Sequence, residues 1–348
     1  MTLPTGAISL SQVNTELDIS PSSTTINMGA TAVRTLADQP SGAIAMSDLQ
    51  GKSNAQFIQA TGGTIATQGD YKVHTFTSDA TFTVQGAGNA AGSNTVEYLV
   101  VAGGGSGGAG YGGGGGAGGF RVNYPSPAAG GLPVSAQGYP ITVGGGAGGA
   151  PNARYTTKGQ DGSDSVFSSI TSTGGGGGGA LEPQFGGAQG LSGGSGGGAG
   201  AANSSPSTAD GAGNSPPVSP PQGNPGGHAF GNPSPRRGGG GGGGASEAGG
   251  DPQGEDAAGA GGDGTATSIT GSPVTYAGGG GGGYFRPGPG GMPEAPGGDG
   301  GGGDGGSQPT AGQAGSANTG GGSGANGGLR SGSSGGGSGI VVVRYKFQ

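Results

Sequence analysis

A strand-like pattern of apolar and polar residues occupies only a small part of this chain, between residues 55 and 102. The segment YKVHTFTSDATFTV, residues 71–84, is rich in Thr, Val and aromatic residues, and its pattern places Phe82 and Val84 on one face. Ser78 and Asp79 supply a turn between two strands. His74 is expected to be a partly exposed residue of the first strand. The segment TVEYLVVA, residues 95–102, is apolar enough to form a third, buried strand.

A matching apolar segment, GIVVVRYKF, occurs far along the chain at residues 339–347. The two apolar segments flank a glycine-rich region, and we expect them to pair in one sheet. The sequence therefore predicts a small β-sandwich over residues 55–102, closed by strand 339–347, with residues 103–338 inserted between its strands.

The first 54 residues contain a weak internal repeat. GAISLSQV, residues 6–13, returns as GAIAMSDL at residues 42–49, and Ser9 followed by Gln12 is typical of a capping box. Between the copies, Val33 and Leu36 have the spacing of a short helix. Because these pieces carry few apolar residues, we expect residues 1–54 to dock on a partner or to trimerise.

Glycine dominates residues 103–338, and 99 of the 348 residues of the chain are glycine. Uninterrupted runs recur at 112–116, 174–179, 238–244 and 278–283. Segments of β-type composition precede several runs, at residues 139–143, 165–173 and 267–277. Other segments between runs are irregular and rich in Pro and aromatic residues, for example 180–192 and 284–296. Glycine runs therefore alternate with segments of other composition, a regularity that a random low-complexity sequence would not be expected to show.

Packed polyglycine helices explain this alternation. Collagen is excluded, because its triple helix needs glycine at every third position without a break. A polyproline II helix of glycine has three residues per turn, and its backbone N–H and C=O groups point outward. Several such helices can pack side by side and hydrogen-bond to one another, because no side chain separates them. In such a bundle the β-type segments lie at the end near the sandwich, and the irregular segments lie at the opposite end.

Composition and charge restrict the classes of function. The net charge of -7 is unfavourable for binding nucleic acid, the absence of cysteine excludes disulfides and thiolate chemistry, and 29% apolar residues allow only small hydrophobic cores. The N-terminal sequence lacks the features of a signal peptide, and no stretch is apolar enough for a membrane helix. We therefore expect synthesis in a cytoplasm and no membrane insertion. The GKS motif at 51–53 lacks the earlier glycine of a P-loop, since Met46 stands there, and is predicted to be a turn.

No constellation of nucleophile, base and orienting group can be assembled, so the sequence predicts neither an enzyme nor a cofactor or metal site. Asp299 and Asp304 are expected to cap turns. Aromatic and basic residues between the runs have two interpretations: they cover the ends of the bundle, or they bind a receptor. The receptor-binding candidates are Tyr124, Tyr155, Phe185, His228, Phe230, Arg236, Tyr284, Phe285 and Arg286.

The segment VEYLVVAGGGSGGAGYGGGGGAGGF, the repeated glycine blocks and the terminal GGSGIVVVRY are similar to the glycine-rich domain of phage virion proteins. The N-terminal LPTGAISLSQVNTEL resembles the start of phage tail-fibre proteins. The first resemblance covers the chain from about Thr95 onward.

The resemblance implies a virion tail component related to tail-fibre-tip adhesins. In those adhesins, loops between polyglycine II helices contact a surface receptor of the host, either a polysaccharide or an outer-membrane protein. It also implies attachment to other tail proteins through residues 1–54 and assembly as a homotrimer. In the adhesin interpretation, segments 203–237 and 284–296 are exchangeable receptor-binding loops. Two alternatives stay open: a purely structural virion fibre, spacer or decoration protein, and a disordered glycine-rich linker.

Overall fold

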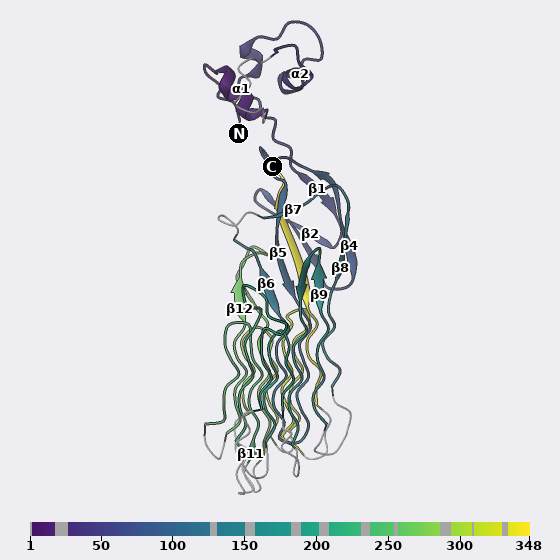
Figure 1. Ribbon diagram of the computed structural model, residues 1–348, viewed down its shortest axis with the longest axis vertical. Coiled ribbons are helices and arrows are strands. Elements are labelled where there is room, and N and C mark those ends of the chain that lie inside the picture. The colour runs from purple at the N-terminus through teal and green to yellow at the C-terminus, as the bar shows by residue number, and fades with distance from the viewer. Residues whose placement is uncertain are drawn as a thin grey trace.

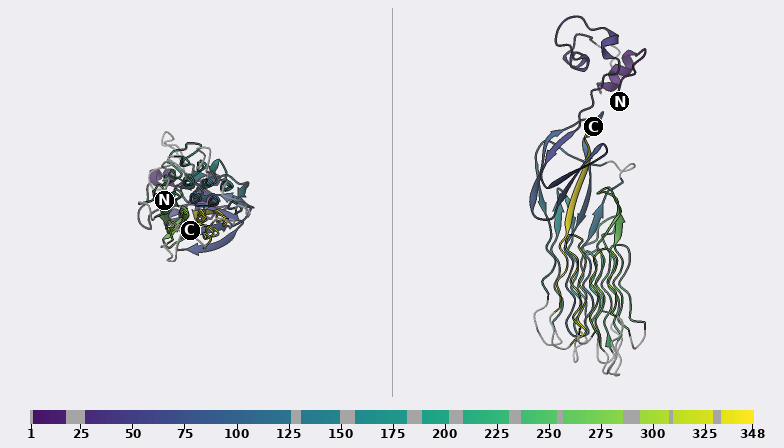
Figure 2. Two further views of the ribbon diagram at one scale, coloured as in Figure 1. Left: turned by 90° about the horizontal axis from the view of Figure 1, so that it is seen from below. Right: turned by 180° about the vertical axis from the view of Figure 1, so that it is seen from behind.

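The computed structural model describes residues 2–17, 27–125, 131–149, 157–181, 189–201, 209–230, 237–253, 257–285, 294–307, 310–328 and 333–348. The molecule is elongated, with short helices at one end, β-sheets in the middle and a bundle of extended segments below them (Figure 1). Both chain ends lie on the side of the bundle where the sheets are. The view from behind in Figure 2 shows the same three parts in a row. We call the end of the bundle opposite the sheets the far end.

The N-terminal unit is built from three short helices, α1 (Leu10–Glu16), α2 (Thr31–Ala37) and the 3-10 helix η1 (Met46–Leu49). They enclose a small core of Leu3, Val13, Val33, Leu36, Ala37 and Leu49. The helix containing Val33 and Leu36 is confirmed. No helix among the described residues is long and apolar enough to cross a membrane.

The two copies of the repeat begin their helices in the same way. The Ser9 side chain accepts a hydrogen bond from the Gln12 amide, and the Gln12 side chain accepts one from the Ser9 amide, so the predicted capping box is present. In the second copy, an Asp48 carboxylate oxygen lies 2.8 Å from the Ala45 amide nitrogen and caps η1. Gly51 follows with φ at 67°, which confirms the turn predicted at the GKS motif.

Two antiparallel sheets pack face to face in the middle of the molecule. The six-stranded sheet has the order β2-β3-β15-β5-β6, with β7 also paired to β5, and the five-stranded sheet has the order β1-β4-β8-β9-β10. The strands of the first sheet are β2 (Thr64–Gln68), β3 (Tyr71–Phe76), β15 (Ile340–Lys346), β5 (Thr95–Val101), β6 (Phe120–Val122) and β7 (Leu132–Pro133). Those of the second are β1 (Ile58–Thr61), β4 (Ala80–Ala87), β8 (Gly138–Thr142), β9 (Ser165–Phe167) and β10 (Ile170–Ser172).

The pairing of the two apolar segments is confirmed. Strand β15 lies antiparallel to β5 with Ile340 opposite Val101, and its other edge pairs with β3. The predicted turn at Ser78 and Asp79 is present, and it carries the chain from β3 in one sheet to β4 in the other. The sheets also take β6 to β10 from within the glycine-rich region, because segments of β-type composition there return to the sheets.

The six-stranded sheet is apolar on both faces, which explains the continuous apolar sequence of β5 and β15. Its inner face packs on the second sheet around Phe82, whose ring is fully buried and contacts five other aromatic rings. Its outer face carries Leu99 and Val342. This face is covered by Ile269 and Tyr276 from the hairpin of β12 (Thr265–Thr267) and β13 (Val274–Tyr276).

The expectation that His74 is partly exposed is wrong, because its ring is fully buried in the inner core. Nδ1 lies 2.7 Å from the Gly62 carbonyl oxygen, and Nε2 lies 3.2 Å from the Tyr345 hydroxyl. These two partners satisfy the polar atoms of the ring and allow it to be buried. Burial lowers the pKa of His74, as does the positive charge of Lys72, while the Gly62 carbonyl opposes them.

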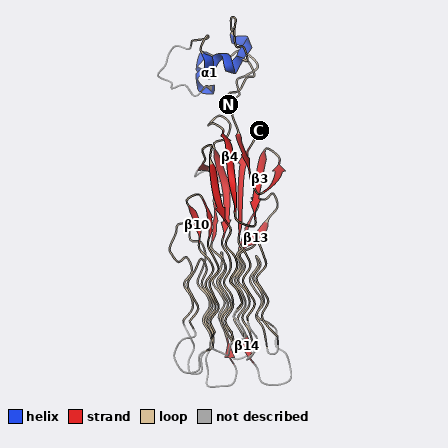
Figure 3. Ribbon diagram, turned by 90° about the vertical axis from the view of Figure 1, so that its right-hand side faces the viewer, coloured by secondary structure: helices blue, strands red, loops and turns tan. Residues whose placement is uncertain are grey.

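Below the sheets, the glycine runs lie side by side along the long axis (Figure 3). Their backbone hydrogen bonds repeat with a period of three residues. Every third amide of residues 103–109 donates to one neighbouring segment, from Gly103 to Ser163, from Ser106 to Gln160 and from Ala109 to Thr157. Gly105 and Gly108 donate to a second neighbour, residues 113–116. Each run therefore bonds to several neighbours arranged around it, unlike a strand in a sheet, which has two.

The close approach of these backbones leaves no room for side chains. A Cβ atom added at Gly114 would lie 2.0 Å from the Gly280 carbonyl oxygen, and one at Gly178 would lie 1.9 Å from the Gly113 carbonyl oxygen. Most glycines of the bundle have similar neighbours. The described runs are thus packed and hydrogen-bonded, so they are not the flexible linker that their composition allows.

Candidate functional site at the far end of the bundle

Short strand pairs join neighbouring segments at the far end. Strand β11 (Arg237–Gly238) lies antiparallel to β14 (Tyr284–Phe285), which Figure 3 shows at the end of the bundle opposite the sheets. The Phe230 amide donates to the Gly238 carbonyl at 3.0 Å, and Tyr284 forms a parallel bridge with Ser307. The structure therefore brings together three of the predicted site residues, Phe230, Tyr284 and Phe285.

The aromatic residues in this group differ in burial. The Tyr284 side chain is 3% exposed, whereas Phe230 is half-buried. Tyr284 therefore has the bundle-covering role that the sequence left open. Phe230 is partly accessible to another molecule.

His228 lies two residues from Phe230 and is held between two carboxylates. Its Nδ1 is 3.0 Å from Asp210 Oδ1, and its backbone amide donates to Asp251 Oδ1 at 2.7 Å. The His228 side chain is 47% exposed. The arrangement presents at the surface an imidazole that Asp210 orients, while Asp251 holds the His228 backbone.

The sequence interpretation missed one aromatic residue at the far end, Tyr111. The chain reverses direction at residues 109–111, where Tyr111 adopts a positive φ of 57°. Its ring is 3% exposed and packs with Leu181 and Ala201 from two other segments. A tyrosine inside the glycine tract was the available signal, since a bulky side chain there must lie where the backbones separate.

The other predicted site residues lie elsewhere or outside the described residues. Tyr124 follows β6 at the sheets, where the Arg344 guanidinium lies 5.0 Å from the centre of its ring. It is therefore distant from the far-end group. For Phe285 only the backbone position is described. The predictions for Tyr155, Phe185, Arg236 and Arg286 lie outside the described residues.

The interpretation of residues 203–237 as one loop is wrong for its described part. Residues 209–230 run to the sheets and return, and their proline-rich middle lies beside β6 and β10. Gln222 fixes this position: its carbonyl accepts from the Phe120 amide at 2.8 Å, and its side-chain oxygen accepts from the Thr173 amide at 2.9 Å. Only the end of this stretch, around His228 and Phe230, reaches the far end.

Of the two carboxylates that the sequence assigned to turns, the Asp304 carboxylate bonds to a backbone amide and a side-chain amide, whereas Asp299 bonds through its backbone amide. Asp304 accepts hydrogen bonds from the Gly297 amide and the Gln313 side chain. The Asp299 amide donates to Asp263. Within the described ranges, no group of three or more His, Cys, Asp or Glu side chains is arranged to hold a metal ion.

Comparison with protein families gives one match. Residues 77–346 match a family described as a glycine-rich domain. The matched range begins between β3 and β4 and ends with β15, so that it contains the bundle and most of both sheets. No curated protein matches the chain.

Proposed function

Because the chain belongs to the glycine-rich domain family, we propose that it is a non-enzymatic component of a phage tail whose far end binds a receptor on the host cell. This function rests on the resemblance of the glycine region and N-terminus to phage virion proteins, together with the arrangement of the far end. The receptor is a surface polysaccharide or an outer-membrane protein. The protein is made in the host cytoplasm and is carried in the virion as a homotrimer.

The scaffold of this adhesin is a bundle of polyglycine II helices. The period of three in the hydrogen bonds and the close backbone contacts support this description. The glycines within the runs also avoid the positive φ that marks the glycines of turns such as Gly110, Gly300 and Gly301. A polyglycine II bundle is rigid because each segment bonds to several others, which suits a spacer that holds its end at a fixed distance.

The two ends of the molecule have different roles in this proposal. The N-terminal unit, with residues 1–54, attaches to another tail protein. It lies beyond the sheets, at the opposite end of the long axis from β11 (Figure 1) and its partner β14 (Figure 3). Attachment at one end leaves the other end directed away from the virion.

One observation carries the receptor-binding role: Phe230 and His228 remain accessible at the far end, although the rest of the bundle is packed backbone to backbone. Tyr, Phe, His and Arg residues in such positions are effective contacts for proteins and sugars. Loops held by a rigid scaffold are also where binding usually resides.

The test uses the purified full chain and cells of the bacterium that the encoding phage infects. We expect labelled protein to bind these cells saturably and to compete with phage adsorption. His228→Ala and Phe230→Ala should each weaken binding about tenfold or more, as expected for residues at the centre of an interface. Lys346→Gln, at the sheets, serves as the matched control and should bind as the unchanged protein does.

Two results would contradict the receptor-binding role. The first is a folded, protease-resistant chain that binds no host cells, which would leave a structural spacer as the function. The second is binding that the far-end substitutions leave unchanged, which would move the receptor site to another surface.

A further inference from the structure

A cavity of about 230 Å³ opens beside β6, between the sheets and the proline-rich segment that precedes Gln222. It is lined by Tyr98, Phe120, Arg121, Val122, Pro220, Pro221, Ala245 and Thr265. Its walls are mainly apolar, and Arg121 is the only charged residue among the described residues that line it. An apolar pocket with a few polar groups is the usual form of a small-molecule site.

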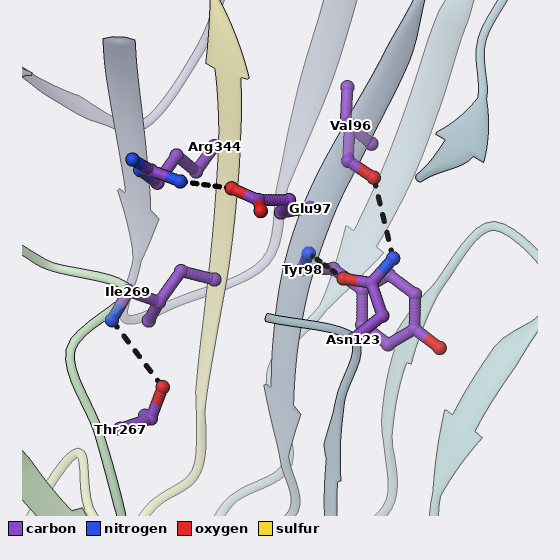
Figure 4. A network of polar contacts seen from close by, with 7 residues as sticks. All are labelled: Val96, Glu97, Tyr98, Asn123, Thr267, Ile269 and Arg344. Atoms are coloured by element: carbon purple, nitrogen blue, oxygen red, sulfur yellow. Dashed lines mark hydrogen bonds and ion pairs between the residues drawn. The ribbon is translucent and has the colours of Figure 1, made fainter. Parts of the chain in front are cut away.

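Arg121 differs from the other basic residues of the two large sheets. Lys72 lies 4.6 Å from the Phe347 ring centre, Lys346 lies 5.8 Å from that of Phe57, and Arg344 lies 3.6 Å from that of Tyr71. Arg344 also pairs with Glu97 (Figure 4). Arg121 has neither a carboxylate nor an aromatic partner among the described residues. Its Nη1 makes one long hydrogen bond of 3.4 Å, to the Thr171 carbonyl.

Arg121 is half-buried as a residue, and its guanidinium donates to the carbonyl of an exposed residue, so its charged group can reach solvent or a ligand at the mouth of the cavity. The chain is also acidic, with 19 Asp and Glu against 12 Lys and Arg. An arginine with no carboxylate partner among the described residues, at the wall of a cavity, is available to pair with a bound anion. A planar guanidinium binds a carboxylate with two parallel hydrogen bonds.

Tyr98, which lines the same cavity as Arg121, is held in place by Asn123. The Asn123 Oδ1 accepts from the Tyr98 amide at 2.6 Å, and its Nδ2 donates to the Val96 carbonyl at 3.5 Å (Figure 4). Asn123 therefore fixes the strand next to the cavity. The half-buried Tyr98 ring makes a T-shaped contact with Phe167, at 6.4 Å between ring centres, and its remaining surface lines the cavity. Such an aromatic ring beside polar groups suits the C–H face of a sugar.

We propose that this cavity binds one uronic acid unit of a polysaccharide. The Arg121 guanidinium pairs with the carboxylate, the Tyr98 ring and Pro220 pack against the sugar ring, and Thr265 lies within the same cavity to bond its hydroxyls. The volume is below the range of pockets for drug-sized ligands, which restricts the occupant to about one sugar ring. A single positive charge matches one carboxylate better than a doubly charged phosphate.

This site lies at the sheets and is independent of the far end. Its test therefore uses free sugars, so that it succeeds or fails separately from the binding of whole cells. The full chain is titrated with trigalacturonate by isothermal calorimetry, up to about 10 mM so that weak binding is measurable. Neutral galactose supplies the ring without the carboxylate, and acetate supplies the carboxylate without the ring.

We expect trigalacturonate to bind and both controls to bind at least about tenfold more weakly. Arg121→Gln should weaken binding about tenfold or more, because it removes a charge-assisted hydrogen bond. Tyr98→Phe should keep most of the binding, because it retains the ring. Lys346→Gln, which removes an equal charge outside the cavity, should leave binding unchanged.

No binding at the highest concentration, equal binding of galactose or acetate, or equal loss in Arg121→Gln and Lys346→Gln would each overturn the proposal. The thermal unfolding midpoint of every variant is measured alongside. If Arg121→Gln unfolds, Arg121→Lys replaces it: this variant keeps the charge but loses the bidentate geometry, and a binding constant equal to that of the unchanged protein would overturn the proposal.

Discussion

Two adjacent glycines, Gly145 and Gly146, give a direct test of why the bundle is made of glycine. A Cβ at Gly146 would lie 2.0 Å from the Gly336 carbonyl oxygen, whereas one at Gly145 would have no heavy atom within 4 Å. Neither residue has a positive φ. An alanine at position 146 would therefore clash with neighbouring atoms without any strain in its backbone dihedral angles, whereas an alanine at position 145 would meet no obstacle.

The cost at Gly146 follows from the distance. Ordinary van der Waals contact begins at 3.4 Å, so the two segments must separate by about 1.4 Å. That movement breaks the hydrogen bonds from Gly336 to Ala147, at 3.0 Å, and from Gly339 to Gly144, at 2.8 Å. Each of the two bonds contributes about 0.5–1.5 kcal/mol and overpacking costs about 1–3 kcal/mol, so Gly146→Ala should destabilise the protein by about 2–6 kcal/mol.

Gly145→Ala should have the opposite sign. It reduces the conformational entropy of the unfolded chain and adds no clash, which stabilises a protein by about 0.4–1 kcal/mol. The free energy of unfolding of both variants is measured by pulse proteolysis in urea, which reports on the bundle itself. Equal destabilisation by the two variants would refute the reasoning, since it would mean that glycine is needed at the outward position too.

Three further predictions concern the sheets and the N-terminal unit. Burial places the pKa of His74 below its unfolded value of about 6.5, so the unfolded state binds more protons between the two values. The unfolding free energy should therefore be constant above about pH 6.5 and should decrease as the pH is lowered further. His74→Gln should reduce this pH dependence, measured by denaturation curves at pH values from 8 to 5. Phe82→Ala should lower the unfolding free energy by about 3–5 kcal/mol in the same assay, because the Phe82 ring is fully buried. Val274 is 39% exposed, so Val274→Ala should change the unfolding free energy by less than about 0.5 kcal/mol. Ser9→Ala should remove the cap of α1 and cost about 1 kcal/mol, measured as faster amide exchange over Leu10–Glu16; unchanged exchange would show that the cap contributes nothing.

The strands could be predicted where side chains form a pattern. Strands β5 and β15 are recognisable as continuous apolar segments, and such segments are expected to lie together in the middle of a sheet that is covered on both faces. The burial of His74 could not be predicted, because it depends on the Gly62 carbonyl and Tyr345, which are distant in sequence and reach the ring only in the folded sheet.

The order of the runs within the bundle could not be predicted either. A run of six glycines has no side chain to distinguish one neighbour or one register from another. The few polar residues buried in the runs supply that distinction. Ser323 Oγ accepts from the Gly107 amide and donates to the Ser334 carbonyl, and Ser195 Oγ donates to the Gly244 carbonyl. These serine hydrogen bonds favour one register between neighbouring runs. The sequence alone does not show that register, because it does not show which runs are neighbours.

The sequence predicted which types of residue would form the far-end site, but not which of them would lie together there. Phe230, Tyr284 and Phe285 meet because β11 and β14 pair, although nearly fifty residues separate those strands. Tyr124 has the same composition signal and lies at the sheets, because the chain reaches it immediately after β6. Aromatic content alone does not show which end of the bundle a turn occupies.

The position of β15 has a consequence for how the protein is made. This strand lies between β3 and β5 in the sheet, yet in the chain it follows every glycine run. During translation, β3 and β5 leave the ribosome early. They stay unpaired with β15 while more than two hundred further residues are translated. Closing a sheet across so long an insertion makes folding slow. A chain interrupted anywhere in the glycine region lacks the strand that joins β3 to β5, so only polypeptides translated through β15 can complete the six-stranded sheet.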